Sequence, residues 1–209
     1  MPKVERTTLV VLALMSVIVL AGCAPTKQQP LPSPTWSGSA PTGPLESDTW
    51  VVGARASLSA QAIAQNRNDF SLDVLTNTTG EELRTRLFTS ARESVRAGNE
   101  SVVSPGPTPF APSEVVVADD DASAVVRGCL ADDWASSDGA VPSRLRAHGV
   151  EFRLQRSGDR TLMVENASVP GLDCSQAELP IALFSPAPEP SQVSDPADIV
   201  RPAPVADDE

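Results

Sequence analysis

Two proline-rich segments, one early and one late in the sequence, flank the part of the chain that can form a packed core. Residues 24–44 read APTKQQPLPSPTWSGSAPTGP, and residues 185–209 contain six prolines and close in Ala-Asp-Asp-Glu. Such segments carry few large apolar side chains, and proline keeps their backbone extended. We therefore expect a tether over residues 23–44, a single domain over residues 45–184 and a disordered acidic tail over residues 185–209.

The first 22 residues predict an export signal. Lys3 and Arg6 precede the largely apolar run TTLVVLALMSVIVL of residues 7–20. This is the charged n-region followed by the apolar h-region of a secretory signal. The run is shorter than the about 20 apolar residues that a membrane-spanning helix needs. We therefore expect the segment to be removed after export.

The cysteine that follows this run predicts a lipid anchor. Leu20-Ala21-Gly22-Cys23 resembles the lipobox of bacterial lipoproteins, in which a signal peptidase cuts before the cysteine. The resemblance implies that residues 1–22 are removed and that the thiol of Cys23 carries a diacylglycerol, with palmitate among the acyl chains. Two or more long chains hold a protein on a membrane essentially permanently. The expected location is the extracytoplasmic face of the cell membrane; the alternative is an ordinary cleaved signal with a coincidental cysteine.

Charge and cysteine content narrow the possible partners. The formal net charge is −11, which argues against nucleic acid as a partner because phosphate neutralisation drives that binding. With Cys23 committed to lipid, Cys129 and Cys174 remain, and outside the cytoplasm such a pair predicts a disulfide. A catalytic thiol would need a nearby base, and the only histidine is His148. Two cysteines without further ligands also make a poor zinc site.

Hydrophobic periodicity predicts an α+β domain. Apolar residues recur at helical spacing over residues 49–65, which Asp48 can cap, and over residues 79–98, where Thr79 and Glu82 form a capping box. From Ser113 the period becomes strand-like. The expected strands are residues 113–118, 122–130, 150–155 and 161–169. Two helices packed on a curved antiparallel sheet are the expected architecture, and this order is similar to the nuclear transport factor 2-like cone.

A second resemblance is carried by residues 127–134, RGCLADDW, together with Asp138-Gly139, the alternating segment 150–154 and the segment GLDC at 171–174. These resemble small secreted lipoproteins of high-GC Gram-positive bacteria. The resemblance implies a location in the cell envelope and implies no activity.

Candidate site residues are few. His148 shares strand parity with Val150, so it could point inward and act as an acid or base oriented by Asp132 or Asp133; a half-exposed histidine at a strand end is the other interpretation. Trp134 is either an exposed recognition handle or a lid over the disulfide.

Clustered aspartates at 119–121 and 132–133 invite calcium, yet their spacing does not match an EF-hand loop. We expect no cofactor and no metal. The sequence therefore predicts a non-enzymatic envelope module that binds a small ligand or a protein partner; the alternative is an enzyme that uses His148 in a cavity.

Overall fold

The computed structural model describes residues 30–203. The chain divides into two units, Met1–Pro30 and Leu31–Glu209, and every element below belongs to the second. The predicted signal segment and Cys23 lie outside the described residues. Within residues 30–203 no helix has the length and apolarity needed to cross a membrane.

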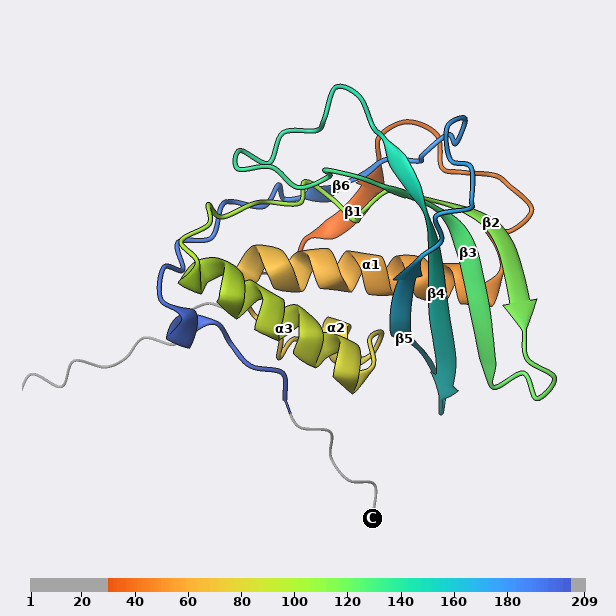
Figure 1. Ribbon diagram of the computed structural model, residues 1–209, viewed down its shortest axis with the longest axis horizontal. Coiled ribbons are helices and arrows are strands. Elements are labelled where there is room, and N and C mark those ends of the chain that lie inside the picture. The colour runs from red at the N-terminus through yellow and green to blue at the C-terminus, as the bar shows by residue number, and fades with distance from the viewer. Residues whose placement is uncertain (1–29, 204–209) are drawn as a thin grey trace, which may run out of the picture. The chain divides into compact units, whose positions relative to one another are not determined.

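The described part of the chain is an α+β fold with two antiparallel sheets (Figure 1). Strands β2, β3, β4 and β5 form the larger sheet in that order, and β1 pairs with β6 in a separate two-stranded sheet. The predicted class, helices on an antiparallel sheet, agrees with this arrangement. The elements are β1 (Ser33–Trp36), α1 (Thr49–Arg67), α2 (Asp73–Thr76), α3 (Glu81–Arg96), β2 (Phe110–Val117), β3 (Ser123–Ala131), β4 (Ala147–Ser157), β5 (Arg160–Ser168), β6 (Ala182–Ser185) and the short 3-10 helix η1 (Pro196–Asp198).

Helix α1 begins and lies where the sequence predicted. The Asp48 carboxylate accepts hydrogen bonds from the backbone N–H groups of Trp50 (2.8 Å) and Val51 (3.3 Å), which satisfies donors that the first turn leaves free. Buried residues occur on every side of α1, as in a helix that is surrounded by other elements. Small residues permit this close packing: a Cβ added at Gly53 would lie 2.6 Å from Cγ2 of Thr161 on β5.

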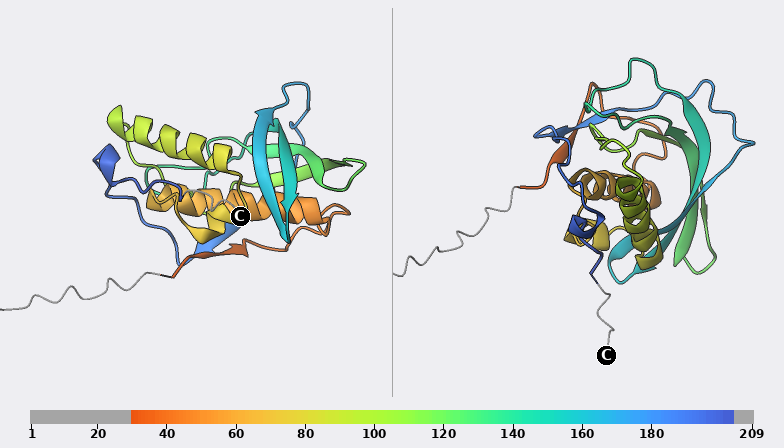
Figure 2. Two further views of the ribbon diagram at one scale, coloured as in Figure 1. Left: turned by 90° about the horizontal axis from the view of Figure 1, so that it is seen from below. Right: turned by 60° about the vertical axis from the view of Figure 1, so that its left-hand side comes forward.

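The main core lies between α1 and the concave face of the larger sheet, which curls around the helices in Figure 2. Phe152, Leu154 and Met163 are fully buried there against Trp50 and Val51 of α1. Burying each such side chain contributes about 1.5–3 kcal/mol. Because α1 fills the concave face, the accessible surface of α1 that remains for a ligand is on the side away from this sheet.

The start of α3 differs from the predicted capping box. The N-cap residue is Gly80, which provides no side-chain cap, and the helix begins at Glu81. The Thr79 side chain is buried and shares a 2.8 Å hydrogen bond with the Ser57 hydroxyl of α1. Thr79 therefore joins two helices instead of capping one, because a tertiary partner competes for its hydroxyl.

Part of the predicted tether belongs to the fold. Strand β1 lies within residues 23–44, and its backbone pairs in antiparallel register with β6, from Ser33 opposite Ser185 to Trp36 opposite Ala182. The composition of this segment is typical of one that cannot fold alone. It is ordered here by backbone hydrogen bonds to β6, a strand that is distant in the sequence. The compact unit therefore begins at Leu31, before the domain boundary predicted at residue 45.

The predicted disorder of the tail is also corrected from residue 185, the last residue of β6, to residue 203. The backbone of Val200 accepts a hydrogen bond from Phe70 N–H and donates one to Asn68 C=O, at 3.0 and 2.9 Å. Ile199 is 4% exposed and packs with Phe70 and Phe88 in a second apolar cluster. Buried apolar surface and paired backbone groups hold this segment, although its proline content is typical of disorder.

Arg84 of α3 is an unusual member of the interior. It is 2% exposed and donates to the Thr76 hydroxyl at 3.0 Å, while its Nε has no hydrogen-bond partner. Burial removes water from the guanidinium and lowers the pKa of Arg84, and nearby Glu81 partly opposes this shift. A buried cation without a close carboxylate costs folding free energy.

Candidate functional site

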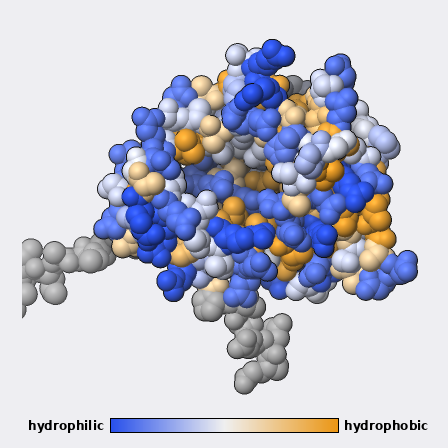
Figure 3. All heavy atoms as spheres, viewed as in Figure 1, coloured by the Kyte–Doolittle hydropathy of each residue, from blue (hydrophilic) through white to orange (hydrophobic). Residues whose placement is uncertain are grey.

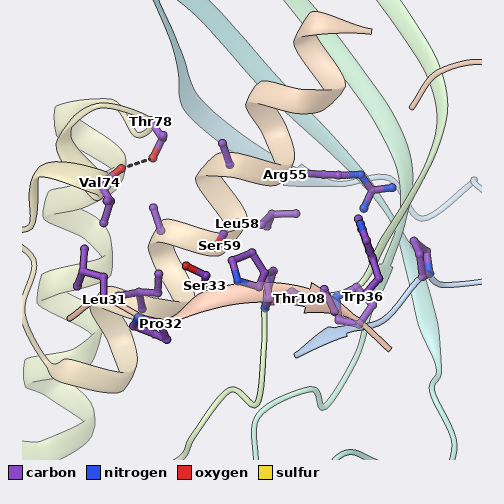
Figure 4. A pocket seen from close by; sticks show the side chains of 18 of the residues that line it. Leu31, Pro32, Ser33, Trp36, Arg55, Leu58, Ser59, Val74, Thr78 and Thr108 are labelled. Carbon is purple, nitrogen blue, oxygen red and sulfur yellow. Dashed lines mark hydrogen bonds between the residues drawn. The ribbon is translucent and has the colours of Figure 1, made fainter. Parts of the chain in front are cut away.

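An apolar pocket lies on the side of α1 that faces β1, away from the larger sheet (Figure 4). Its volume is about 590 Å³. The walls are α1, the segment from Leu31 to Trp36, the end of α2, the loop before β2 and the start of β6. The apolar lining residues are Leu31, Pro32, Pro34, Trp36, Ala56, Leu58, Ala60, Ile63, Val74, Pro107, Pro109, Pro180 and Ala182.

Polar groups in this pocket are few, and some are already satisfied. The Thr78 hydroxyl donates a 2.7 Å hydrogen bond to the Val74 carbonyl, as the dashed line in Figure 4 shows. Arg55 is the one charged side chain among the described lining residues. An apolar lining with a small number of placed polar groups is typical of a small-molecule site.

Arg55 is held rigidly at the pocket wall. Its Nε and Nη2 donate to both carboxylate oxygens of Glu46, at distances between 2.8 and 3.1 Å. Its guanidinium carbon lies 5.5 Å from the centroid of the Trp36 ring and 5.8 Å from that of Phe110. The exposed fractions of the Arg55 and Glu46 side chains are 19% and 16%, so this ion pair is mostly desolvated. Arg55 thereby fastens Trp36 of β1 to α1.

The two ends of the pocket differ. In Figure 4, Leu31, Pro32 and Val74 lie at one end, and Arg55 and Trp36 lie at the other. Leu58, Ser59 and Ser33 lie between the two ends. One end of the pocket is therefore mainly apolar, with Thr78 beside Val74, and the other end carries a cation and an indole.

A second pocket, also of about 590 Å³, opens between α3 and the loop that follows it. Figure 3 shows the surface hollowed above α3, bordered mainly by hydrophilic residues. Its polar lining includes Gln65, Asn66, Asn68, Ser90, Ser94, Asn99, Ser101 and Ser104. Several of these groups already bond to each other: Asn66 accepts from and donates to the Ser104 backbone. This lining consequently serves the fold in part.

The structure brings the predicted histidine and aspartate together. Nδ1 of His148 lies 2.6 Å from Oδ1 of Asp132, and the two side chains are 42% and 35% exposed. Asp133 instead forms an ion pair with Arg146. His148 is not among the residues that line either of the two pockets described above. Val150 and Phe152 point into the core, whereas His148, at the start of β4, remains half exposed.

Trp134 is a structural residue. It is 4% exposed, and its indole N–H donates a 2.8 Å hydrogen bond to the Gly106 carbonyl. The interpretation of Trp134 as an exposed binding residue is therefore wrong. The indole holds the loop after β3 to the loop before β2, because a buried indole needs an acceptor.

The acidic turns are engaged in local structure. Asp120 accepts from the Ala122 backbone N–H at 2.9 Å, and Asp121 pairs with Arg156 at 3.3 Å. Asp138 accepts from Ala140 N–H and the Ser136 hydroxyl, and these hydrogen bonds lower the pKa of Asp138. Within residues 30–203 no group of three or more His, Cys, Asp or Glu side chains is arranged to hold a metal ion.

Cys129 and Cys174 form the predicted disulfide, with Cα atoms 5.6 Å apart. Cys129 lies on β3, and Cys174 lies in the loop after β5. The disulfide therefore fastens that loop to the larger sheet, and neither sulfur is a free thiol.

Comparison with known proteins adds little to this geometry. No protein-family model and no curated protein sequence matches the chain. Among solved structures, the intermembrane space region of the chloroplast protein ARC6 is similar over 63% of this chain and 100% of that one, with 13% sequence identity and a TM-score of 0.36. A similarity of this size supports no inference about function.

The sequence reasoning missed the apolar pocket. Its walls come from a proline-rich segment at one end of the chain, a central helix and a late strand. The available signal was Trp36, a large apolar residue in a segment otherwise poor in them. A lone tryptophan in such a segment indicates docking onto something, because it has no local core to enter.

Proposed function

We propose that this protein is a lipid-anchored, extracytoplasmic module that binds a small apolar ligand in the pocket between α1 and β1, without catalysing a reaction. The observation that carries the proposal is the pocket of about 590 Å³ with a predominantly apolar lining. Ligand sites typically enclose about 300–1,000 Å³. A concave apolar site of this size fits a small molecule better than a folded partner, which needs a broad complementary surface.

The lipid anchor is supported by the resemblance of residues 20–23 to a lipobox. Cys23 precedes Leu31, at the pocket wall, by only eight positions. Eight residues span at most about 28 Å when fully extended. A lipid on Cys23 would therefore keep the pocket within reach of the membrane surface.

The enzyme alternative would rest on the His148–Asp132 pair. That pair is half exposed and lines none of the pockets described above. General acid–base catalysis needs the substrate held within hydrogen-bond reach of the catalytic group. The binding function is accordingly the better supported of the two.

The finer architecture, a nuclear transport factor 2-like cone, is also proposed. Its support is the way in which the larger sheet curls around the helices in Figure 2. In this chain α1 occupies the inside of that curve, so the proposed ligand site lies outside it.

Ligand binding can be tested on the mature chain from residue 23 carrying Cys23→Ala, with Nile red as an apolar fluorescent probe. We expect saturable binding with increased fluorescence. Ser59→Trp, which places an indole on the half-exposed pocket floor, should abolish it. Thr85→Trp, on the exposed surface of α3, is the matched control and should bind normally. Equal binding by both variants, or none by the parent, would contradict the proposal.

Anchoring is tested separately. The parent chain should fractionate with membranes, and Cys23→Ala should release it into the medium. Mass spectrometry of the membrane-extracted protein should show an acylated Cys23 as the first residue. An unacylated first residue would overturn the anchor and leave the ligand site unaffected.

A further inference from the structure

We propose that the ligand of the α1–β1 pocket is a single-chain amphiphile with an anionic head, whose chain lies along α1 and whose head lies at Arg55. This inference rests on the proposed ligand-binding function and specifies its ligand. It draws on the length of the pocket, the different character of its two ends and the charge at one end.

The length of the pocket matches one acyl chain. Along α1 the lining extends from Arg55 to Ile63, which spans about 12 Å at the helical rise per residue. Along the opposite wall it extends from Leu31 to Trp36, about 17 Å at the strand rise. Half of the hydrocarbon core of a bilayer, the depth that one acyl chain fills, is about 15 Å. A single chain of membrane length therefore fits between the two walls.

The apolar end suits the methyl end of such a chain. Leu31, Pro32 and Val74 lie together there in Figure 4. Ile63 of α1 also lines the pocket and is 5% exposed. Among the described residues at this end, no charged side chain lines the pocket. A charged head would lose its hydration here without gaining a partner, so the head is expected at the opposite end.

Arg55 provides the partner for an anionic head. Its Nε and Nη2 are committed to Glu46, whereas Nη1 has no hydrogen-bond partner among residues 30–203. Nη1 is also not buried, so it reaches solvent or the open pocket. The Glu46 pair and the Trp36 ring fix the guanidinium in place. A carboxylate or phosphate oxygen could accept from Nη1 without reorganising Arg55, as a preorganised site requires.

Glu46 makes the effect of charge testable in both directions. Glu46 neutralises Arg55 and lies at its other edge, at 2.8 Å from Nη2. Removing the carboxylate leaves Arg55 as an uncompensated cation, which should favour an anionic head. Removing the guanidinium leaves Glu46 as an uncompensated anion, which should oppose it.

The experiment measures the dissociation constants of palmitate and of hexadecanol, which share a chain and differ in the head, by displacement of Nile red from the Cys23→Ala mature chain. We expect palmitate to bind about tenfold more tightly, the value of one charge-assisted hydrogen bond. Arg55→Gln should abolish this preference, and Glu46→Gln should increase it. Arg144→Gln, an exposed arginine outside the pocket, should leave the preference unchanged.

The outcomes separate the two proposals. If Nile red binds in the pocket but neither chain displaces it, the amphiphile is wrong and the apolar site stands. If Nile red does not bind, the proposed function itself fails. Equal affinity for palmitate and hexadecanol, or a preference that Arg55→Gln leaves intact, overturns the role of Arg55. Palmitoyl-lysophosphatidylglycerol, compared in the same assay, distinguishes a phospholipid source from a free fatty acid.

Discussion

Loss of the Cys129–Cys174 disulfide should destabilise the fold by an amount that can be calculated from the loop it closes. The two cysteines are 45 positions apart in the sequence. In the chain-entropy model, closing a loop of this length removes about 4 kcal/mol of conformational free energy from the unfolded chain. That is a large share of the about 5–15 kcal/mol that stabilises a typical domain. Thermal unfolding should shift downward by about 8–16 °C, since about 2–4 °C accompany each kcal/mol in a domain of this size.

The assay compares the Cys129→Ala, Cys174→Ala double variant with its parent in urea unfolding, both in the Cys23→Ala background so that no third thiol can exchange. The parent should also lose the same stability when a reductant is added, and the double variant should not respond to it. A loss below about 1 kcal/mol, or a reductant effect on the double variant, would refute the reasoning. A loss below about 1 kcal/mol would mean that other contacts hold the loop after β5 even in the unfolded chain.

Three further substitutions test the packing and charges of the fold. Glu151→Gln should destabilise the fold at neutral pH. The hydrogen bond from Arg127 lowers the pKa of Glu151, so the carboxylate stabilises the fold at pH values above its unfolded pKa. In urea unfolding, the difference between variant and parent should vanish as the pH falls through the folded pKa of Glu151. Trp134→Phe keeps one aromatic ring but removes the N–H that bonds the Gly106 carbonyl and leaves a buried cavity, so calorimetry should show a loss of at least about 1–3 kcal/mol. Arg84→Met removes a buried charge that lacks a close carboxylate, so unfolding should show unchanged or increased stability; a loss above about 3 kcal/mol would contradict this interpretation.

Local patterns predicted the two long helices and the four strands of the larger sheet, because local physics determines these elements. The helix over residues 49–65 was predicted from its apolar spacing and its Asp48 cap, and α1 occupies Thr49–Arg67 with that cap. Alternation around Val150 and Phe152 predicted β4, and both side chains are buried. The disulfide was predicted by counting cysteines on the expectation of an oxidising compartment, and Cys129 and Cys174 form it.

Long-range pairing could not be predicted in the same way. Strand β1 is extended and contains proline, and such a sequence is compatible both with an unpaired extended segment and with a strand that pairs with β6. Ile199 and Val200 are two apolar residues in a polar tail. Ile199 is ordered by packing against Phe70, and Val200 is ordered by its backbone hydrogen bonds to Asn68 and Phe70. The apolar pocket needs β1 in place on α1, so it could not be predicted before that pairing was known.

The pairing of β1 with β6 has a mechanical consequence if the chain is anchored at Cys23, as proposed. Any pull between the membrane and the domain would enter the fold through Leu31 and load the four-residue strand β1 first. The backbone of β1 pairs with β6, and its Trp36 ring lies 5.5 Å from the guanidinium carbon of Arg55 on α1. Tension on β1 would therefore act first on one wall of the pocket, which β1 forms, and only afterwards on the core between α1 and the larger sheet.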